Sequence, residues 1–347
     1  MAVAEGGRAG VVVRGARVPQ FVDQPPCRTS VFDSAAGVRR VPDHWRSAAP
    51  RPRECRCVAS IRGANVPPET KEKMMDSQFD TVVAAYERSM DEMPFREHVE
   101  AFSFLKAVGE VAACDVLDLG CGSGLYARRL CHAGAIRVLG MDESSAMVEH
   151  ARRREEREGL GVEYLAADAT DPATGALPGI AGRFDVVTAV YVLPYAPTRA
   201  ALDGFCATAR RALRAEGGRF VAAVLNPEFS TDPEWYRDYG MSLSARPSPV
   251  EGTPGHLRAW VGPDVLELDF FRWSRAAHEQ ALAAAGFDRI TWIRPTVSEQ
   301  GRARYGEAFW ANYLACPHAL IVDAQAGPRD EPPVDAPAKS IDSATDK

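Results

Sequence analysis

Residues 116–124 read VLDLGCGSG, a mostly apolar run followed by glycines at alternate positions, Gly120, Gly122 and Gly124. The apolar run is typical of a buried strand, and the glycines permit a tight turn directly after it. Many α/β proteins hold a nucleotide at a strand that ends in such a glycine-rich turn. The stretch therefore predicts a nucleotide site at the carboxyl end of a strand.

Segments with strand and helix character alternate along the middle of the chain. We expect strands at 115–119, 137–141, 162–166, 184–190 and 219–225, with closing strands at 289–294 and 319–322. Apolar residues at helical spacing, caps and terminating glycines predict helices at 80–88, 95–108, 124–133, 144–154, 202–213 and 274–286. This alternation predicts an α/β fold, a Rossmann-like doubly wound parallel sheet.

The alternation stops after Asn226. Residues 227–273 contain two strand-like runs, 256–261 and 265–273, joined by Gly-Pro, and these predict a hairpin. We therefore expect 227–273 to be an insertion that covers the nucleotide half as a lid. Its aromatic and histidine side chains can line a pocket or simply pack the insertion onto the sheet; they are Trp235, Tyr236, Tyr239 and His256.

The two ends of the chain differ from its middle. Residues 1–74 contain 13 basic and 7 acidic side chains, with recurring prolines and no sustained period. They predict a disordered extension; a targeting role, or a true start at Met74 or Met75, are the alternatives. The Pro-, Asp- and Ala-rich segment 326–347 predicts a disordered tail, which leaves 75–325 as the folded domain.

Composition excludes several classes of protein. No apolar stretch is long enough for a membrane span. The eight cysteines show no C-x-x-C pair, so no metal site is expected, and those in apolar segments indicate a reduced, cytoplasmic protein (Cys114, Cys121, Cys131 and Cys206). The net charge of the whole chain is −6, and that of residues 1–74 is +6. The rest of the chain therefore has a net charge of −12 and would repel nucleic acid.

The glycine spacing argues against a nicotinamide dinucleotide. A dinucleotide turn reads G-x-G-x-x-G, and here its third glycine position is occupied by Leu125. Asp118 lies inside the strand two residues before the first glycine, where a carboxylate would repel a pyrophosphate. The carboxylate would suit a ligand that carries a positively charged group, or it could simply accept hydrogen bonds from the backbone amides of the loop.

Two further acids end neighbouring strands. Asp142, followed by Glu143, ends the second strand, where a carboxylate can accept both ribose hydroxyls. Asp168 ends the third, where a carboxylate and adjacent amides can read an adenine edge. An adenosine that bears a sulfonium and an amino acid fits three acids along this crevice; an anionic dinucleotide does not.

The chain resembles class I S-adenosylmethionine-dependent methyltransferases of the small-molecule type. The resemblance covers roughly 78–325 and rests on five segments in this order: VLDLGCGSG, VLGMDESSAMVEHAR, VEYLAADAT, FDVVTAVYVLPYA and GGRFVAAV. It implies a seven-stranded sheet of the methyltransferase type, S-adenosylmethionine as cofactor, and methyl transfer that needs neither a metal nor a nucleophilic side chain.

The resemblance also implies roles for particular residues. Asp118 and the three glycines would surround the methionine portion, and Asp142 would hold the ribose. Met147 would cover the adenine, or else be ordinary helix core, with Asp168 and Ala169 at the adenine edge. Near the sulfonium we expect the segment that includes Val190. Tyr86 would close over the cofactor, and Arg96 would pair with its carboxylate unless it is a solvated surface charge.

The acceptor is expected to be a small organic molecule, methylated on N or O in specialised metabolism. Tyr191, Tyr195 and Asn226 lie where it would approach, and the strand exit AVYVLPYA lacks the (D/N)-P-P-(F/Y) signature of enzymes that methylate nucleic-acid bases. No histidine is an evident base; His256 is the one candidate, and His318 is expected to be structural. A non-catalytic cofactor-binding module and an aminopropyl transferase of the same fold are the alternatives.

Overall fold

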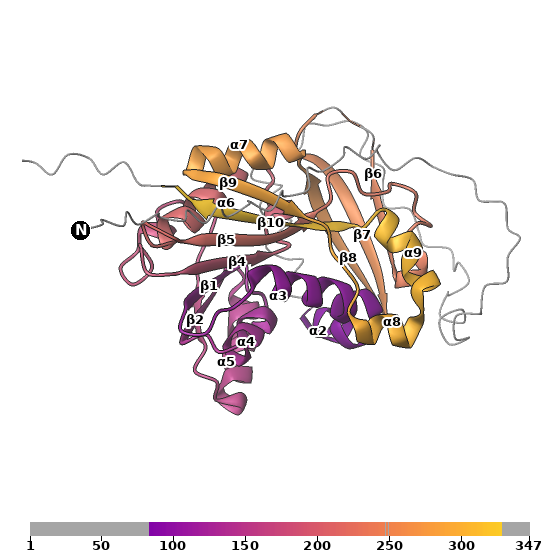
Figure 1. The fold of residues 1–347 in the computed structure, drawn as a ribbon, viewed down its shortest axis with the longest axis horizontal. Coiled ribbons are helices and arrows are strands. Elements are labelled where there is room, and N and C mark those ends of the chain that lie inside the picture. The colour runs from indigo at the N-terminus through magenta and orange to yellow at the C-terminus, as the bar shows by residue number, and fades with distance from the viewer. Residues whose placement is uncertain (1–82, 247, 249, 328–347) are drawn as a thin grey trace, which may run out of the picture.

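The computed structural model describes residues 83–246, 248 and 250–327, and seven of its strands form one sheet (Figure 1). In sheet order the strands are β3 (Glu163–Ala166), β2 (Arg137–Asp142), β1 (Asp115–Leu119), β4 (Val186–Val190), β5 (Arg219–Leu225), β10 (Ala319–Ala326) and β9 (Phe287–Ile293). The strand β10 runs antiparallel to β5 and β9, and the other pairings are parallel. The predicted Rossmann-like sheet is confirmed.

Helices cover both faces of this sheet. On one face lie α3 (Phe102–Val108), α4 (Leu125–His132) and α5 (Ser145–Glu158), and on the other α6 (Arg199–Ala212) and α7 (Arg275–Ala285). Alternate residues of β1 divide between the two cores: Val116 packs with α4, whereas Leu117 and Leu119 pack with α6. No helix among the residues described is long and apolar enough to cross a bilayer.

The strand order changes direction between β1 and β4, which are neighbours in the sheet. The chain winds from β1 outward to β3 and then returns to continue from β4 on the other side. Open α/β sheets bind ligands at the carboxyl ends of the strands at such a switch point. The glycine turn after β1 and Tyr191 after β4 therefore meet at one crevice.

A second sheet lies beside the first and is called here the lid sheet (Figure 1). It consists of β6 (Met241–Ala245), β7 (Thr253–Val261) and β8 (Asp264–Arg272), paired antiparallel. The predicted hairpin is confirmed as β7 and β8. The strand β6 and two helices that pack on this side, α8 (Glu299–Tyr305) and α9 (Glu307–Ala315), were not predicted.

Two of the candidate lid aromatics, Tyr236 and Tyr239, pack the insertion onto the body of the protein instead of lining a pocket. Tyr236 and Tyr239 are 0% and 1% exposed and stack edge-on against Tyr313 of α9. The Tyr239 hydroxyl donates to the carbonyl of Phe309 at 2.7 Å. The insertion thus joins the body of the protein through rings that cannot also line a pocket.

Most predicted element boundaries agree within a few residues, and the differences have local causes. The helix α6 begins at Arg199 because Thr198 caps it, accepting from Ala201 N at 3.2 Å. The helix α5 runs on to Glu158, where Gly159 adopts a left-handed conformation. The remaining short segments are α2 (Val83–Glu92), the π-helical turn η2 (Arg96–Ala101), and the 3-10 turns η3 (Thr174–Ala176), η4 (Leu193–Tyr195) and η5 (Arg237–Tyr239).

The domain bounds 75–325 remain a prediction. The predicted extension 1–74 lies outside the described residues. So does the predicted tail 326–347, except for Ala326, which ends β10, and Gly327.

Gly204, inside α6, offers a test of this packing. A Cβ there would stand 1.8 Å from the carbonyl oxygen of Thr170. Helix propensity alone would make Gly204→Ala stabilising by about 1 kcal/mol. We expect the opposite sign, a loss of about 1–3 kcal/mol from overpacking. Urea unfolding of the two proteins measures the difference, and an unchanged or raised midpoint would contradict the observed contact.

Candidate functional site

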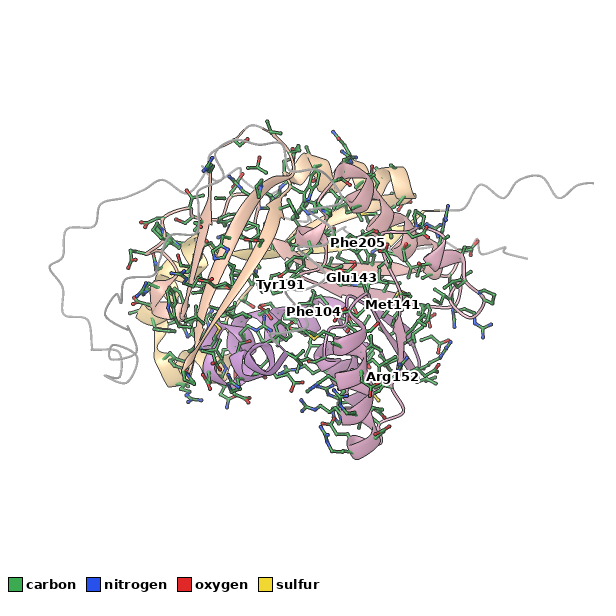
Figure 2. The ribbon with its side chains drawn as sticks, turned by 180° about the vertical axis from the view of Figure 1, so that it is seen from behind. Phe104, Met141, Glu143, Arg152, Tyr191 and Phe205 are labelled. Carbon is green, nitrogen blue, oxygen red and sulfur yellow. The ribbon has the colours of Figure 1, made fainter. Side chains whose placement is uncertain are left out.

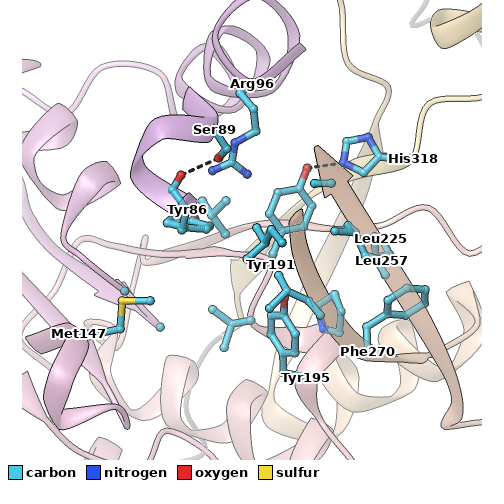
Figure 3. Close-up of a pocket in the computed structure, with 18 of the residues that line it drawn as sticks. Tyr86, Ser89, Arg96, Met147, Tyr191, Tyr195, Leu225, Leu257, Phe270 and His318 are labelled. Atoms are coloured by element: carbon cyan, nitrogen blue, oxygen red, sulfur yellow. Dashed lines mark hydrogen bonds between the residues drawn. The ribbon is translucent and has the colours of Figure 1, made fainter. Parts of the chain in front are cut away.

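A cavity opens at the carboxyl ends of β1 and β4 and extends to the lid sheet (Figure 3). Figure 3 shows Met147 on one side, Leu257 and Phe270 on the other, and Tyr191 between them. One end is lined by residues of the glycine turn and strand ends: Gly120, Gly122, Asp142, Glu143, Met147, Ala169 and Val190. The far end is lined by apolar residues of the lid sheet: Met241, Leu257, Ala259, Leu266, Leu268 and Phe270.

The glycine turn needs its glycines for two reasons. Gly120, Gly122 and Gly124 have φ of 60°, 54° and 79°, a region that favours glycine. A Cβ on Gly120 would stand 2.3 Å from the side chain of Val192, whereas one on Gly122 would meet no atom within 4 Å. The turn at Gly122 therefore leaves open space where a ligand can approach the backbone.

Asp142 is hydrogen-bonded to the glycine turn, and Asp118 is hydrogen-bonded to β4. Asp142 accepts from the amide of Gly122 at 2.8 Å and from that of Ser144 at 2.9 Å. Asp118 is 2% exposed and accepts from the hydroxyl of Thr188 at 2.8 Å. Burial, offset in part by Thr188, raises the pKa of Asp118 to about 7, and the charge of Asp142 contributes.

The structure brings together most of the residues that the sequence selected. Those that line the cavity are Tyr86, Arg96, Gly120, Gly122, Asp142, Met147, Ala169, Val190, Tyr191 and Tyr195. Those that do not are Asp118, Gly124, Asp168, Asn226 and His256. The first set defines the site, and the roles of individual residues within it remain predictions.

Three residues outside the cavity have other partners. Asp168 is exposed and accepts from both the amide and the hydroxyl of Thr170 at 2.7 Å. Asn226 donates to the carbonyl of Pro317 at 2.8 Å and lines a smaller hollow. The ring of His256 lies 2.9 Å from Asp269 on the lid sheet. His256 thus lies apart from the cavity, and its part as a base stays a prediction.

Arg96 is buried rather than solvated. It is 6% exposed, lies 4.9 Å from the ring centroid of Tyr86, and its Nη1 is 3.2 Å from Oε1 of Glu100. Its Nη2 is buried and has no hydrogen-bond partner among the described residues. A buried guanidinium nitrogen without a partner is costly, and a ligand carboxylate in the cavity would satisfy it.

Glu100 accepts from two tyrosines. The hydroxyl of Tyr126 lies 2.7 Å from Oε1, and that of Tyr191 lies 2.7 Å from Oε2. A carboxylate can only accept, so both hydroxyls donate to it. The π-helical turn η2 places Arg96 and Glu100 four residues apart on the same side, and such turns are frequent at functional sites.

The hydrogen-bond donors and acceptors around the ring of His318 determine its tautomer. Burial, with the charge of Arg96, lowers the pKa of His318 to about 3, so the ring is neutral. Because the Tyr191 proton goes to Glu100, Tyr191 accepts from His318 Nε2–H at 2.9 Å. The other nitrogen, Nδ1, therefore accepts from the Tyr313 hydroxyl at 2.8 Å. The hydrogen bonds from Tyr313 to His318, from His318 to Tyr191 and from Tyr191 to Glu100 therefore all run in one direction, toward Glu100.

Sequence reasoning missed Glu100 and gave His318 only a structural part. The one local signal was the spacing of Arg96 and Glu100, which suits an ion pair on a helix. The partners of Glu100 are 26 and 91 residues away, so no local pattern reveals them.

A family model described as a methyltransferase domain matches residues 116–217. An O-methyltransferase of ubiquinone biosynthesis from Xanthomonas axonopodis is 32% identical over 61% of this chain and 79% of that protein. One from Methylocella silvestris is 38% identical over 32% of this chain and 40% of its own length, so the chain spans about two fifths of that relative. An S-adenosylmethionine-dependent methyltransferase structure from Mesorhizobium loti covers 68% of this chain and 99% of its own, with 24% identity and a TM-score of 0.46.

The chain belongs to the class I S-adenosylmethionine-dependent methyltransferases. The residues present fit this cofactor on structural grounds. One cavity is lined by Gly122, beside whose backbone there is open space, and by Arg96, whose Nη2 has no partner among the described residues. Two acids, Asp142 and Glu143, line the same cavity. Such a cavity offers a cation for a carboxylate and anions for a sulfonium and an amine.

The neutral state of His318 predicts a pH dependence of stability. An unfolded histidine takes up a proton near pH 6.5, and the folded ring does not do so until about pH 3, so stability falls as the pH drops between these values. We expect lowering the pH from 7 to 5 to cost about 2 kcal/mol through this residue.

The His318→Gln variant keeps a donor and an acceptor and should lack this loss. Urea unfolding of both proteins at the two pH values measures it. Equal losses in the two proteins would show that His318 is not held neutral.

Proposed function

We propose that the protein transfers the methyl group of S-adenosylmethionine to an oxygen or nitrogen atom of a small organic molecule. The observation that carries this is one continuous cavity with two chemically distinct ends. The strand-end half offers the glycine turn, acids and Arg96, and the lid half offers an apolar enclosure. Small-molecule sites are mostly apolar with a few placed polar groups.

In the strand-end half each residue has a proposed part. Arg96 would bind the carboxylate of the cofactor, and Gly120 would face its amino group. Asp118 does not line the cavity, so its charge would act on that amino group from behind the glycine turn. Asp142 would accept from the ribose, and Met147, with Ala169, would cover the adenine. When bound, the cofactor supplies an electrophilic methyl group. The residues of this chain orient the two reactants and keep water out.

The acceptor half supports a small acceptor. The lid sheet lines the far end of the cavity with aliphatic and aromatic side chains. The sequence outside 1–74 is acidic, which disfavours nucleic acid. The curated relatives named above are called O-methyltransferases of ubiquinone biosynthesis, which favours oxygen as the methylated atom.

An aminopropyl transferase of this fold is disfavoured by a specific observation. Its cofactor is decarboxylated and would leave the buried Nη2 of Arg96 without a partner. A non-catalytic module would not need the apolar half of the cavity, which is lined by the lid sheet.

The function is tested in two steps. Calorimetric titration with S-adenosylmethionine and with NADH compares the two cofactors, and binding of NADH alone would refute the proposal. Cell extract is then incubated with the protein and methyl-labelled S-adenosylmethionine and separated by size. Label in the small-molecule fraction supports the proposal, and label only in RNA or protein contradicts it.

The role of Arg96 can be separated from folding with two ligands. S-adenosylhomocysteine carries the carboxylate, and 5′-methylthioadenosine lacks the amino-acid portion. We expect Arg96→Ala to weaken binding of the first at least tenfold, as a charged hydrogen bond is lost, and to leave the second within about threefold. Calorimetry measures both, and equal effects on the two ligands would remove Arg96 from the carboxylate site.

The raised pKa of Asp118 predicts pH-dependent affinity. Near pH 7 its carboxyl group loses its proton, and only the ionised form attracts the ammonium group of the ligand. Binding of S-adenosylhomocysteine should therefore tighten from pH 5.5 to about pH 8 and then level off. In Asp118→Asn the affinity should be weaker and nearly flat over this range. A wild-type affinity that does not change with pH would contradict the assignment.

A further inference from the structure

The structure assigns to Tyr191 and Glu100 the removal of a proton from the methyl acceptor, which identifies the acceptor as an uncharged, largely apolar molecule with a hydroxyl group. This inference rests on the proposed function and goes further by naming the atom class and the proton path. Tyr191 would touch the acceptor as a catalytic residue. Glu100, which acts through Tyr191, would be a positioning residue and the destination of the proton.

Tyr191 occupies the middle of the cavity. It directly follows β4, and Figure 3 shows it between Tyr86 and Arg96 on one side and Leu225 and Leu257 on the other. Figure 2 shows it near the centre of the molecule, between the lid strands and the nucleotide half. A molecule held against the lid sheet and reaching toward the cofactor half passes this side chain.

The hydroxyl of Tyr191 is already polarised for proton transfer. It donates to Oε2 of Glu100 at 2.7 Å and accepts from His318 at 2.9 Å. Burial, with the charge of Glu100, raises the pKa of Tyr191, so the side chain stays a phenol rather than a phenolate. A phenol can take a proton only if it releases its own, and Glu100 is the acceptor already in place.

Within this hydrogen-bond network, Glu100 is also the group that we assign as the final acceptor of the proton from the methyl acceptor. His318 is held neutral and uses both ring nitrogens, Nε2 toward Tyr191 and Nδ1 toward Tyr313. Glu100 accepts from two tyrosines and is balanced by Arg96. Transfer of the proton to Glu100 would leave its two tyrosine partners in place, and Arg96 would keep the carboxylate of the cofactor as its counter-ion in the proposed complex.

The lining of the lid half defines the rest of the acceptor. Its six residues from β6, β7 and β8 are apolar and bring no charge to the cavity (Met241, Leu257, Ala259, Leu266, Leu268 and Phe270). A charged molecule would lose its hydration there without a counter-ion. An uncharged hydroxyl compound enters readily but must lose a proton on methylation, which is the step that Tyr191 and Glu100 serve.

The acceptor oxygen forms a bond to the methyl carbon as the bond from that carbon to sulfur breaks, and the electron pair of the broken bond stays on sulfur. The acceptor proton passes to Oη of Tyr191, and the Tyr191 proton passes to Oε2 of Glu100. The products are a neutral methyl ether, a thioether and a protonated Glu100, which returns its proton to solvent after release.

The chain offers a matched control. Tyr126 and Tyr191 donate to the same carboxylate at 2.7 Å, but Tyr126 does not line the cavity. If Tyr191 only helped to hold Glu100, the Tyr126→Phe and Tyr191→Phe variants would behave alike. A difference between them isolates the contact with the acceptor.

The deciding experiment measures binding of 1-naphthol and naphthalene, two apolar probes that differ in one hydroxyl, by calorimetry with S-adenosylhomocysteine present. We expect the wild-type protein and Tyr126→Phe to bind 1-naphthol about tenfold more tightly than naphthalene, and Tyr191→Phe to bind the two equally. The proposal is overturned if the wild type shows no preference, or if the preference survives in Tyr191→Phe.

Turnover adds a second readout where 1-naphthol is methylated. Tyr191→Phe and Glu100→Gln should lower kcat about 100-fold with little change in KM, and Tyr126→Phe should lower it less than about fivefold. Equal losses in the two tyrosine variants, or faster methylation of 1-naphthylamine than of 1-naphthol, would overturn the proposal. Wild-type binding of S-adenosylhomocysteine is measured first, so failure of the proposed function is recognised separately.

Discussion

A buried ion pair, Arg96 with Glu100, organises the whole site. Both side chains are nearly inaccessible, at 8% and 3% exposure. Replacing such a pair with apolar residues is often neutral or even stabilising, because desolvation offsets the attraction between the charges. Stability alone therefore does not explain why the pair is present. The pair instead places Arg96 at the cavity and leaves its buried Nη2 without a hydrogen-bond partner among the described residues, a cost that a functional role would explain.

The pair also joins elements that the sheet alone would not hold together. Glu100 reaches Tyr126 on α4 and Tyr191 at the end of β4, and Tyr191 continues through His318 to Tyr313 on α9. Each of these groups has a partner, so the low dielectric of the interior strengthens the contacts instead of penalising them. One network of hydrogen bonds thus connects the π-helical turn η2, the central sheet and the helix α9 beside the lid sheet.

The sequence predicted the parts of this site that depend on local chain geometry. The turn after β1 could be recognised because tight turns with positive φ select glycine, and Asp142 because it ends a strand. It could not predict Glu100 and His318, whose contacts with Tyr191 span 91 and 127 residues. For Tyr236 and Tyr239 the sequence left both a pocket and a packing role open, and the structure buries both rings. An aromatic residue in an insertion has the same local sequence pattern in either role.

The lid sheet illustrates the same limit. Its hairpin was evident from two apolar runs around Gly262, but β6 pairs with β7 and was hidden in a segment rich in Pro, Ser and Gly. The third strand matters because it adds Met241 to the cavity wall. Register between strands, rather than local propensity, decided that placement.

Tyr191 shows how the network and the fold act on one residue. Its φ is 57°, which costs a non-glycine residue about 1–2 kcal/mol. The residue is held from both ends: its amide donates to the carbonyl of Ala223 at 2.9 Å, and its hydroxyl is fixed by Glu100 and His318. Strain of this kind persists only where the surroundings determine the conformation more strongly than the backbone does. The position of the Tyr191 hydroxyl is consequently set before any ligand arrives, which is the property required of a group that must meet a reacting atom.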